Sequence, residues 1–256
     1  MSVLEIARSD GIATLTLNRP AAMNALDSEL RGAIQETFAS LRDEDETRVV
    51  ILTGSGRAFS AGIDLKELGS PSPKRRPESS EFSMVGAMHA YPWPIIGAVN
   101  GHAITGGFEL ALACDVLVAS TAAVFADTHA RVGIVPGWGL SQKLPRLIGI
   151  GRAKELSFTG NFLGAEQAER WGLVNRVVAP DELLPACLQL AKDMLSCDPP
   201  SLRRYKQMID EGYATTFGEG IALEARASLE HLAGVTPETV AARRAGVQQR
   251  GRSQQG

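Results

Sequence analysis

The sequence is poor in cysteine and histidine and has no excess of positive charge. Its 256 residues include three cysteines, an odd number without a CxxC pair, so we expect neither a disulfide framework nor a zinc site. His89 and His231 lack acidic or cysteine partners at ligand spacing, and no metal site is predicted. The net charge of −3 gives no electrostatic reason to expect nucleic acid as a partner.

Long apolar runs are also missing. No segment approaches the roughly 18 consecutive apolar residues that indicate a membrane-spanning helix. Arg8 and Asp10 interrupt the apolar stretch near the start, so no signal-peptide core is predicted. The hydrophobic content of 44% is ordinary for a globular chain. We therefore predict a soluble, cytoplasmic protein that does not bind a membrane.

The first half of the chain alternates between strand-like and helical patterns. Asp10-Gly11 favours a hairpin turn between two short strands. Asp27 can cap a helix whose apolar residues follow at helical spacing, namely Leu30, Ile34, Phe38 and Leu41. The remaining strands are predicted at 49–53, 95–99 and 116–118. This pattern predicts an α/β fold.

Beyond residue 151 the pattern becomes mainly helical. Amphipathic helices are predicted around 183–195, 202–209 and 219–232. A β-containing half followed by helices is typical of a core with a helical cap or an oligomerisation arm. We therefore expect a core at 1–180 and a helical oligomerisation region at 181–256.

Two glycine-containing turns follow predicted strands and are candidates for a functional site. The first surrounds Gly62. The second contains Gly106-Gly107, where a helix begins with unpaired N–H groups and the positive end of its dipole, an environment suited to an oxyanion. Glu109 falls in the first turn of that helix. A tight packing turn with a capping glutamate would explain the same residues equally well.

Several motifs together resemble the crotonase (enoyl-CoA hydratase/isomerase) superfamily. AFSAGIDL and NGHAITGGFELALACD are similar to its two characteristic segments, in the family's order and at a fitting separation. NRPAAMNAL, FADTHARVGIVPGWGLSQKLPRLIG and AERWGLVNRVV extend the similarity over roughly residues 3 to 215. The resemblance implies a spiral of ββα turns, with a C-terminal helical region that builds trimers, often paired into hexamers.

The resemblance also implies an acyl-CoA thioester as substrate. The backbone N–H groups of Ile63 and Gly106 would form an oxyanion hole that polarises the thioester carbonyl. The stretch from Ala61 through Asp64 to Leu65 would lie along coenzyme A. Because coenzyme A is part of the substrate, no separate cofactor is expected.

Hydratases of the family use two glutamates to add water to a double bond. Glu109 matches the first, but His129 stands at the position of the second. An imidazole can relay protons near neutral pH. We expect His129 to lie across the substrate from Glu109. Asp127 could cap the short helix or orient His129, which the helix N-terminus would keep neutral.

The resulting prediction is an enoyl-CoA hydratase that adds water in syn fashion to a trans-2-enoyl-CoA, in fatty-acid or related acyl-CoA metabolism. An isomerase, hydrolase or decarboxylase working on the same enolate is an alternative, and so is a catalytically idle acyl-CoA-binding paralogue. The retained Glu109 favours an enzyme, whereas the missing second glutamate favours the idle binder. Trp138 either narrows the acyl pocket or fills core.

Overall fold

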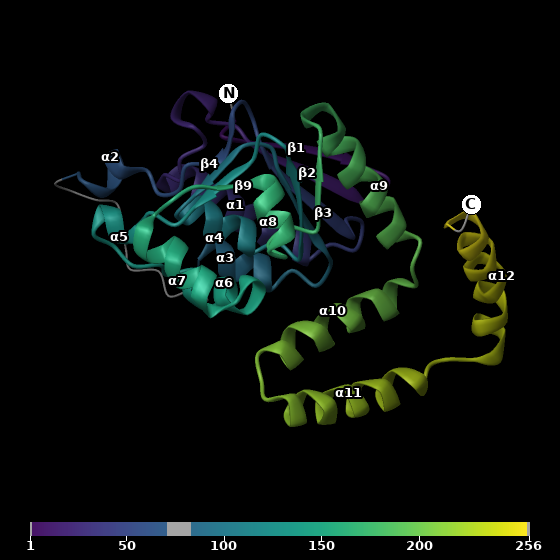
Figure 1. The fold of residues 1–256 in the computed structure, drawn as a ribbon. Coiled ribbons are helices and arrows are strands. Elements are labelled where there is room, and N and C mark those ends of the chain that lie inside the picture. The colour runs from purple at the N-terminus through teal and green to yellow at the C-terminus, as the bar shows by residue number, and fades with distance from the viewer. Residues whose placement is uncertain (1, 71–82, 255–256) are drawn as a thin grey trace. The chain divides into compact units, whose positions relative to one another are not determined.

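The computed structural model describes residues 2–70 and 83–254, which form two compact units at Met1–Cys197 and Asp198–Gly256. The first unit contains two sheets (Figure 1). Its helices are α1 (Ser28–Arg42), α2 (Leu65–Leu68), α3 (Met84–His89), α4 (Gly106–Leu112), α5 (His129–Val132), α6 (Leu140–Ile148), α7 (Ile150–Thr159), α8 (Ala165–Arg170) and α9 (Leu183–Leu195), with 3-10 turns at Pro20–Ala22 and Pro180–Glu182.

The larger sheet has six strands in the order β1-β2-β3-β5-β7-β10. The hairpin of β1 (Leu4–Ser9) and β2 (Ile12–Leu17) is antiparallel, and its turn places Asp10 and Gly11 at positive φ, as an Asp-Gly hairpin requires. The other neighbours pair in parallel. These strands are β3 (Val49–Gly54), β5 (Ile95–Val99), β7 (Val116–Ser120) and β10 (Arg176–Val178).

The smaller sheet has the order β4-β6-β8-β9, made of β4 (Ala58–Ser60), β6 (His102–Ile104), β8 (Val124–Ala126) and β9 (Leu163–Gly164). Successive strands alternate between the sheets: β3, β5 and β7 join the larger one, and β4, β6 and β8 join the smaller one. This alternation is the spiral of ββα turns that the resemblance implied. It brings the ends of β4, β6 and β8 next to one another.

Helix α9 belongs to the core of the first unit. Its residues Leu183, Cys187 and Ala191 are buried against one face of the larger sheet (Figure 1). The opposite face is buried too, since all six residues of β3 are buried. The division between the units therefore follows α9, later in the chain than the boundary expected at 180/181, because the apolar stripe of α9 packs on the sheet.

The helix predicted after Asp27 is α1. The Asp27 carboxylate accepts a hydrogen bond from the N–H of Leu30 at 2.9 Å, and the four apolar residues of the predicted stripe are the buried residues of this helix.

The second unit consists of α10 (Pro199–Tyr213), α11 (Phe217–Leu232) and α12 (Pro237–Gln254). Ser201 Oγ lies 3.0 Å from His231 Nε2, and Arg243 pairs with Asp198 at 2.6 Å. No residue of α10 is buried, and Ala227 is the buried residue of α11. In the described parts of the chain, no helix combines the length and apolar character needed to cross a membrane.

Candidate active site

The two predicted glycine turns meet where β4 and β6 end. Gly107 at the start of α4 packs so closely on β4 that a Cβ there would lie 2.0 Å from the carbonyl oxygen of Ser60. Gly62 has a φ of 85°, and a Cβ there would lie 2.6 Å from the carbonyl oxygen of Ile104. Only glycine fits either position. The two turns can therefore approach each other backbone to backbone.

This approach brings the N–H groups of Ile63 and Gly106 together. A Cβ on Gly106 would lie 3.3 Å from the nitrogen of Ile63, and a Cβ on Gly62 would lie 2.9 Å from the nitrogen of Gly106. Within residues 2–70 and 83–254, neither N–H donates a hydrogen bond to a protein acceptor. Two unpaired backbone donors beside a helix N-terminus can hold a developing oxyanion.

Thr105 directs the Gly106 peptide from an unusual backbone conformation. Its φ of 55° and ψ of −113° are strained for a β-branched residue. The N–H of Thr105 donates to the Ala126 carbonyl at 2.8 Å, and its hydroxyl lies 2.5 Å from the Thr128 hydroxyl. These contacts from β8 and its following turn hold the backbone of Thr105 immediately before the Gly106 N–H.

Glu109 lies buried one turn into α4, with a relative exposure of 2%. Its Oε1 accepts hydrogen bonds from the backbone N–H groups of Trp138 at 2.6 Å and Leu140 at 3.4 Å. Its Oε2 lies 3.3 Å from His129 Nε2. Donors therefore face both oxygens, which suits an ionised carboxylate.

His129 lies between Glu109 and Asp127, and all three are buried. The Nδ1 atom of His129 is 2.6 Å from Asp127 Oδ1, which also accepts the backbone N–H of His129 at 3.2 Å. Asp127 thus both orients the ring and satisfies the first N–H of α5.

The charge of this histidine differs from the expectation. Burial lowers the pKa of His129, but the hydrogen bonds and negative charges of Asp127 and Glu109 outweigh burial and raise the pKa to about 9. Burial raises the pKa of Asp127, and hydrogen bonds from His129 and Ser157 bring that pKa below its ordinary value. The expectation of a neutral imidazole was wrong, because two carboxylates outweigh the short helix's N-terminus.

The relative placement of Glu109 and His129 also differs from the expectation. At 3.3 Å the two side chains are in direct contact, which leaves no room for an acyl chain between them. Both groups must therefore meet a substrate from the same side.

Trp138 has two roles that the sequence did not reveal. Its backbone N–H binds Glu109, and its indole Cζ3 atom would lie 3.0 Å from a Cβ on Gly106. The ring thus lies beside Gly106, one of the two residues with an unpaired N–H group. Glu109 and Trp138 are 29 positions apart in the sequence, so no local pattern indicated the contact.

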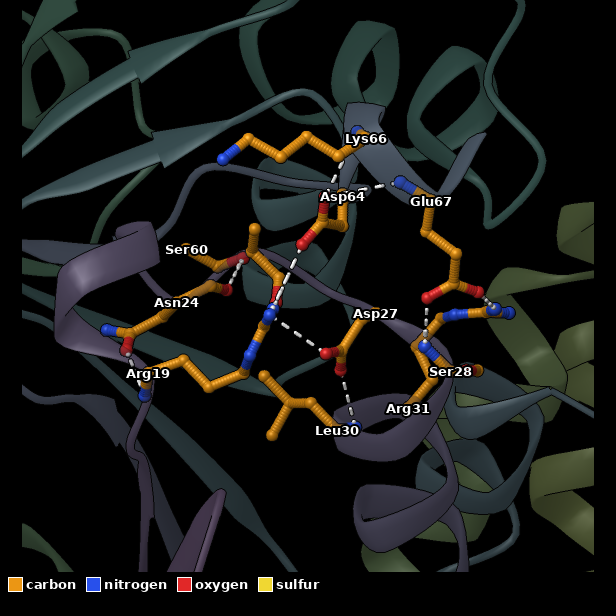
Figure 2. Close-up of polar contacts among 11 residues, drawn as sticks. Arg19, Asn24, Asp27, Ser28, Leu30, Arg31, Ser60, Asp64, Lys66 and Glu67 are labelled. Atoms are coloured by element: carbon orange, nitrogen blue, oxygen red, sulfur yellow. Dashed lines mark hydrogen bonds and ion pairs between the residues drawn. The ribbon is translucent and has the colours of Figure 1, made fainter. Parts of the chain in front are cut away.

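The stretch from Ala61 to Leu65 continues from the first turn into α2 (Figure 2). The Asp64 carboxylate caps α2 through the N–H of Lys66 at 3.1 Å and pairs with Arg19 at 3.3 Å. Burial raises the pKa of Asp64, but the hydrogen bonds from Lys66, Arg19 and Glu67 leave it below the ordinary value. Leu65 is 55% exposed and available to a ligand. The contacts of Asp64 are structural.

The described residues contain no cluster of three or more His, Cys, Asp and Glu side chains arranged to hold a metal ion.

The family model for enoyl-CoA hydratase/isomerase matches residues 7–235 of this chain. The chain belongs to this family. The resemblance to the crotonase superfamily is thereby confirmed.

Relatives and solved structures agree with the family assignment. The chain is 42% identical over 230 residues to a protein named "Probable enoyl-CoA hydratase 1, peroxisomal" from Arabidopsis thaliana, covering 90% of this chain and 86% of the relative. An enoyl-CoA hydratase structure from Bacillus anthracis matches with a TM-score of 0.87 at 34% identity, over 96% of both chains. One from Mycobacterium tuberculosis matches with a TM-score of 0.73 at 42% identity, over 89% of this chain and 98% of that one. The crotonase-type α/β fold is therefore established.

Proposed function

We propose that the protein is an enoyl-CoA hydratase, which adds water in syn fashion to the double bond of a trans-2-enoyl-CoA. The observation that carries this proposal is the buried contact between Glu109 and His129, beside the N–H groups of Ile63 and Gly106. An acceptor, a proton donor and an oxyanion site are thus close together. Hydration of a conjugated thioester needs these three functions.

The thioester carbonyl would accept hydrogen bonds from Ile63 and Gly106. Negative charge collects on this oxygen when a nucleophile attacks the β-carbon. Backbone donors fixed before the reaction stabilise that charge without reorganising. The enolate is therefore the species to which the site is complementary.

The proton transfers balance with Glu109 as the base and His129 as the acid. The oxygen of water bonds to Cβ and loses a proton to Glu109, while Cα takes a proton from His129 Nε2. The product carries hydroxyl and hydrogen on one face, because both groups approach from the same side. Glu109 is left protonated and His129 neutral.

The 3.3 Å contact between Glu109 and His129 then restores the starting state. The proton on Glu109 passes to the neutral Nε2 of His129, without exchange with solvent. Overall, one water is consumed and no redox partner, metal or added cofactor is required. Coenzyme A serves only as the part of the substrate that the protein binds and does not itself react.

Four other functions are alternatives: isomerase, idle acyl-CoA binder, hydrolase and decarboxylase. An isomerase would use Glu109 alone to move one proton between carbons, and the family's description includes isomerases. An idle acyl-CoA binder would have no need for a buried charged cluster, since burying ionised groups costs free energy unless they are paired. Hydrolase or decarboxylase chemistry on the same enolate would release free coenzyme A or carbon dioxide.

Product analysis separates these chemistries. We expect crotonyl-CoA and longer trans-2-enoyl-CoAs to lose the absorbance of the conjugated thioester, and mass spectrometry to show the gain of one water. A product of unchanged mass with a moved double bond would indicate the isomerase. Release of free coenzyme A would indicate a hydrolase, and no reaction of any substrate would indicate the idle binder.

Coenzyme A would follow the stretch from Ala61 to Leu65, with contributions from backbone atoms. Leu65 offers the exposed apolar side chain, and Lys66 beside it is exposed and positively charged. In Figure 2 the Lys66 side chain extends away from Asp64 and Glu67, leaving its ammonium free of those carboxylates.

We also infer a cytoplasmic location, which is consistent with relatives from the bacteria Bacillus subtilis and Mycobacterium leprae.

The assembly we propose is a homotrimer or a dimer of trimers. Helices α10 and α11 bury almost nothing and expose large apolar side chains, which are Tyr205, Ile209, Tyr213, Phe217, Ile221, Leu229 and Leu232. An exposed apolar surface of this kind marks an interface. Light scattering should give a mass of three or six times the 27.3 kDa chain, and a monomer at micromolar concentration would contradict this assembly.

A further inference from the structure

Arg19 lies between two aspartates, Asp27 and Asp64 (Figure 2). Its guanidinium is 2.9 Å from Asp27 and 3.3 Å from Asp64, and it also donates to the carbonyl of Ala25. The three side chains are 15–21% exposed. A planar guanidinium can satisfy several acceptors in different directions at once. Arg19 is therefore held at a fixed point.

Each aspartate caps a helix close to the proposed oxyanion donor, which is the N–H of Ile63. Asp27 caps α1 through Leu30, and Asp64 caps α2 while directly following Ile63. Leu26 forms a parallel bridge with Ile63, in which Leu26 N–H donates to Gly62 at 2.8 Å and Asp64 N–H donates to Leu26 at 3.4 Å. Leu26 and Ile63 are thus paired through their backbones, and Arg19 joins the two aspartates that directly follow them in the chain.

We propose that Arg19 is a positioning residue for the oxyanion hole: by bridging Asp27 and Asp64, it sets the direction of the Ile63 N–H. This inference rests on the proposed function, in which that N–H binds the thioester oxygen. Without Arg19, the Oδ2 atoms of the two carboxylates, which share one Arg19 nitrogen, would have no cation between them. Their repulsion would shift the Asp64 turn and the Ile63 donor with it.

The same two helices are joined by a second ion pair that serves as a matched control. Arg31 of α1 lies 3.6 Å from Glu67 of α2, and Glu67 accepts the N–H of Ser28 at 2.8 Å. In Figure 2 the Arg31–Glu67 ion pair lies apart from the Arg19 guanidinium, and the two groups are linked through the backbone N–H of Glu67, which donates to Asp64 at 3.5 Å. The ion pair itself joins α1 and α2 through the Glu67 side chain. Loss of Arg31 should weaken the helix contact and leave the Ile63 peptide in place.

The test measures hydration of crotonyl-CoA by four variants. Arg19→Gln should lower kcat by about 10- to 100-fold, the cost of a misplaced transition-state donor, with KM changed less than about threefold. Arg31→Gln should keep kcat near the wild-type value. Arg19→Lys should be intermediate. Arg19→Gln combined with Asp27→Asn should recover part of the loss, because only one carboxylate remains and asparagine still caps α1.

A second readout tests the donor directly, without turnover. The enolate of acetoacetyl-CoA carries its charge on the oxygens that the hole would bind, and its absorbance differs from that of the keto form. Wild type and Arg31→Gln should bind the enolate at lower pH than Arg19→Gln does. This readout also decides the inference if the hydration assignment fails.

Several results would overturn the role of Arg19. They are an unchanged kcat and unchanged enolate titration in Arg19→Gln, an equal loss in Arg31→Gln, or an effect confined to KM. No recovery in the double variant would exclude repulsion between the aspartates as the cause. By contrast, wild-type protein that binds the enolate without hydrating crotonyl-CoA would contradict the hydratase proposal and leave the positioning role standing.

Discussion

Two carboxylate–cation–carboxylate groups flank the proposed oxyanion hole, and they differ in what their cation can do. In one, His129 lies between Glu109 and Asp127, with side chains 3–5% exposed. In the other, Arg19 lies between Asp27 and Asp64, with side chains 15–21% exposed. A histidine can give up its proton, whereas an arginine in a protein cannot. In the functions proposed above, the same arrangement serves proton transfer on one side and positioning on the other.

The carboxylates differ as well. Asp27 and Asp64 each cap a helix, so their oxygens are used by backbone N–H groups that belong to the fold. Glu109 accepts N–H groups on Oε1 only and turns Oε2 toward His129. The partner of Oε2 is thus a titratable side chain rather than a backbone N–H of the fold. Burial combined with a titratable partner distinguishes the proposed reacting carboxylate from the two supporting ones.

The largest expected effect comes from removing the base. Glu109→Gln keeps the shape of the side chain and most of its contacts, but the amide cannot accept the proton of water. We expect turnover of enoyl-CoA to fall by about 10²–10⁴-fold, with little change in binding. Steady-state kinetics and the binding of a product analogue measure the two effects. Wild-type turnover would refute the mechanism.

The next effect comes from the oxyanion donors. Gly106→Pro deletes one N–H and distorts the turn, so turnover should fall by about 10²–10³-fold. Ile63→Ala should be mild, because the donor at this position is backbone. Circular dichroism and size-exclusion chromatography of each variant, compared with the wild type, control for folding. A folded, fully active Gly106→Pro protein would exclude this oxyanion hole.

A smaller effect is expected from replacing the acid. His129→Ala should lower turnover less than Glu109→Gln, because water can supply the proton to Cα in the space the ring leaves. His129→Glu, which restores the usual pair of glutamates, should keep or raise hydratase activity. If His129→Ala had no effect while Glu109 mattered, a one-carboxylate isomerase would be the better interpretation.

Much of the fold was readable in the sequence because its signals are local. The alternation in Ile12–Leu17, the apolar run at Val49 and the cap at Asp27 each depend on residues close in the chain. Strands β4, β6 and β8, with three residues each, are too short to show a period. Helix α9 showed its apolar stripe, but the stripe could not indicate whether the sheet or another subunit would cover it.

The candidate site was likewise predictable only where its signals are local in the sequence. Glu109, His129 and the two glycine turns were found through their motifs, and the structure brings them together. The Glu109–Trp138 contact and the Arg19–Asp64 pair join residues 29 and 45 positions apart, which no local pattern reveals. The charge of His129 was missed because it depends on contacts with two carboxylates, Asp127 two residues away and Glu109, which is distant in sequence and adjacent in space. Local electrostatics at a helix end was the wrong guide.

The most direct test of the account is the pH dependence of kcat/KM, because the central claim is that His129 is the acid and carries its proton at neutral pH. With the pKa of His129 raised to about 9, its protonated form persists below that pH, so activity should stay level through neutrality and fall as the pH rises through about 9. In Asp127→Asn, which removes one of the two negative charges, the fall should begin at lower pH. Wild-type activity that rises as the pH passes through 6 to 7, as a neutral imidazole would require, would contradict the account.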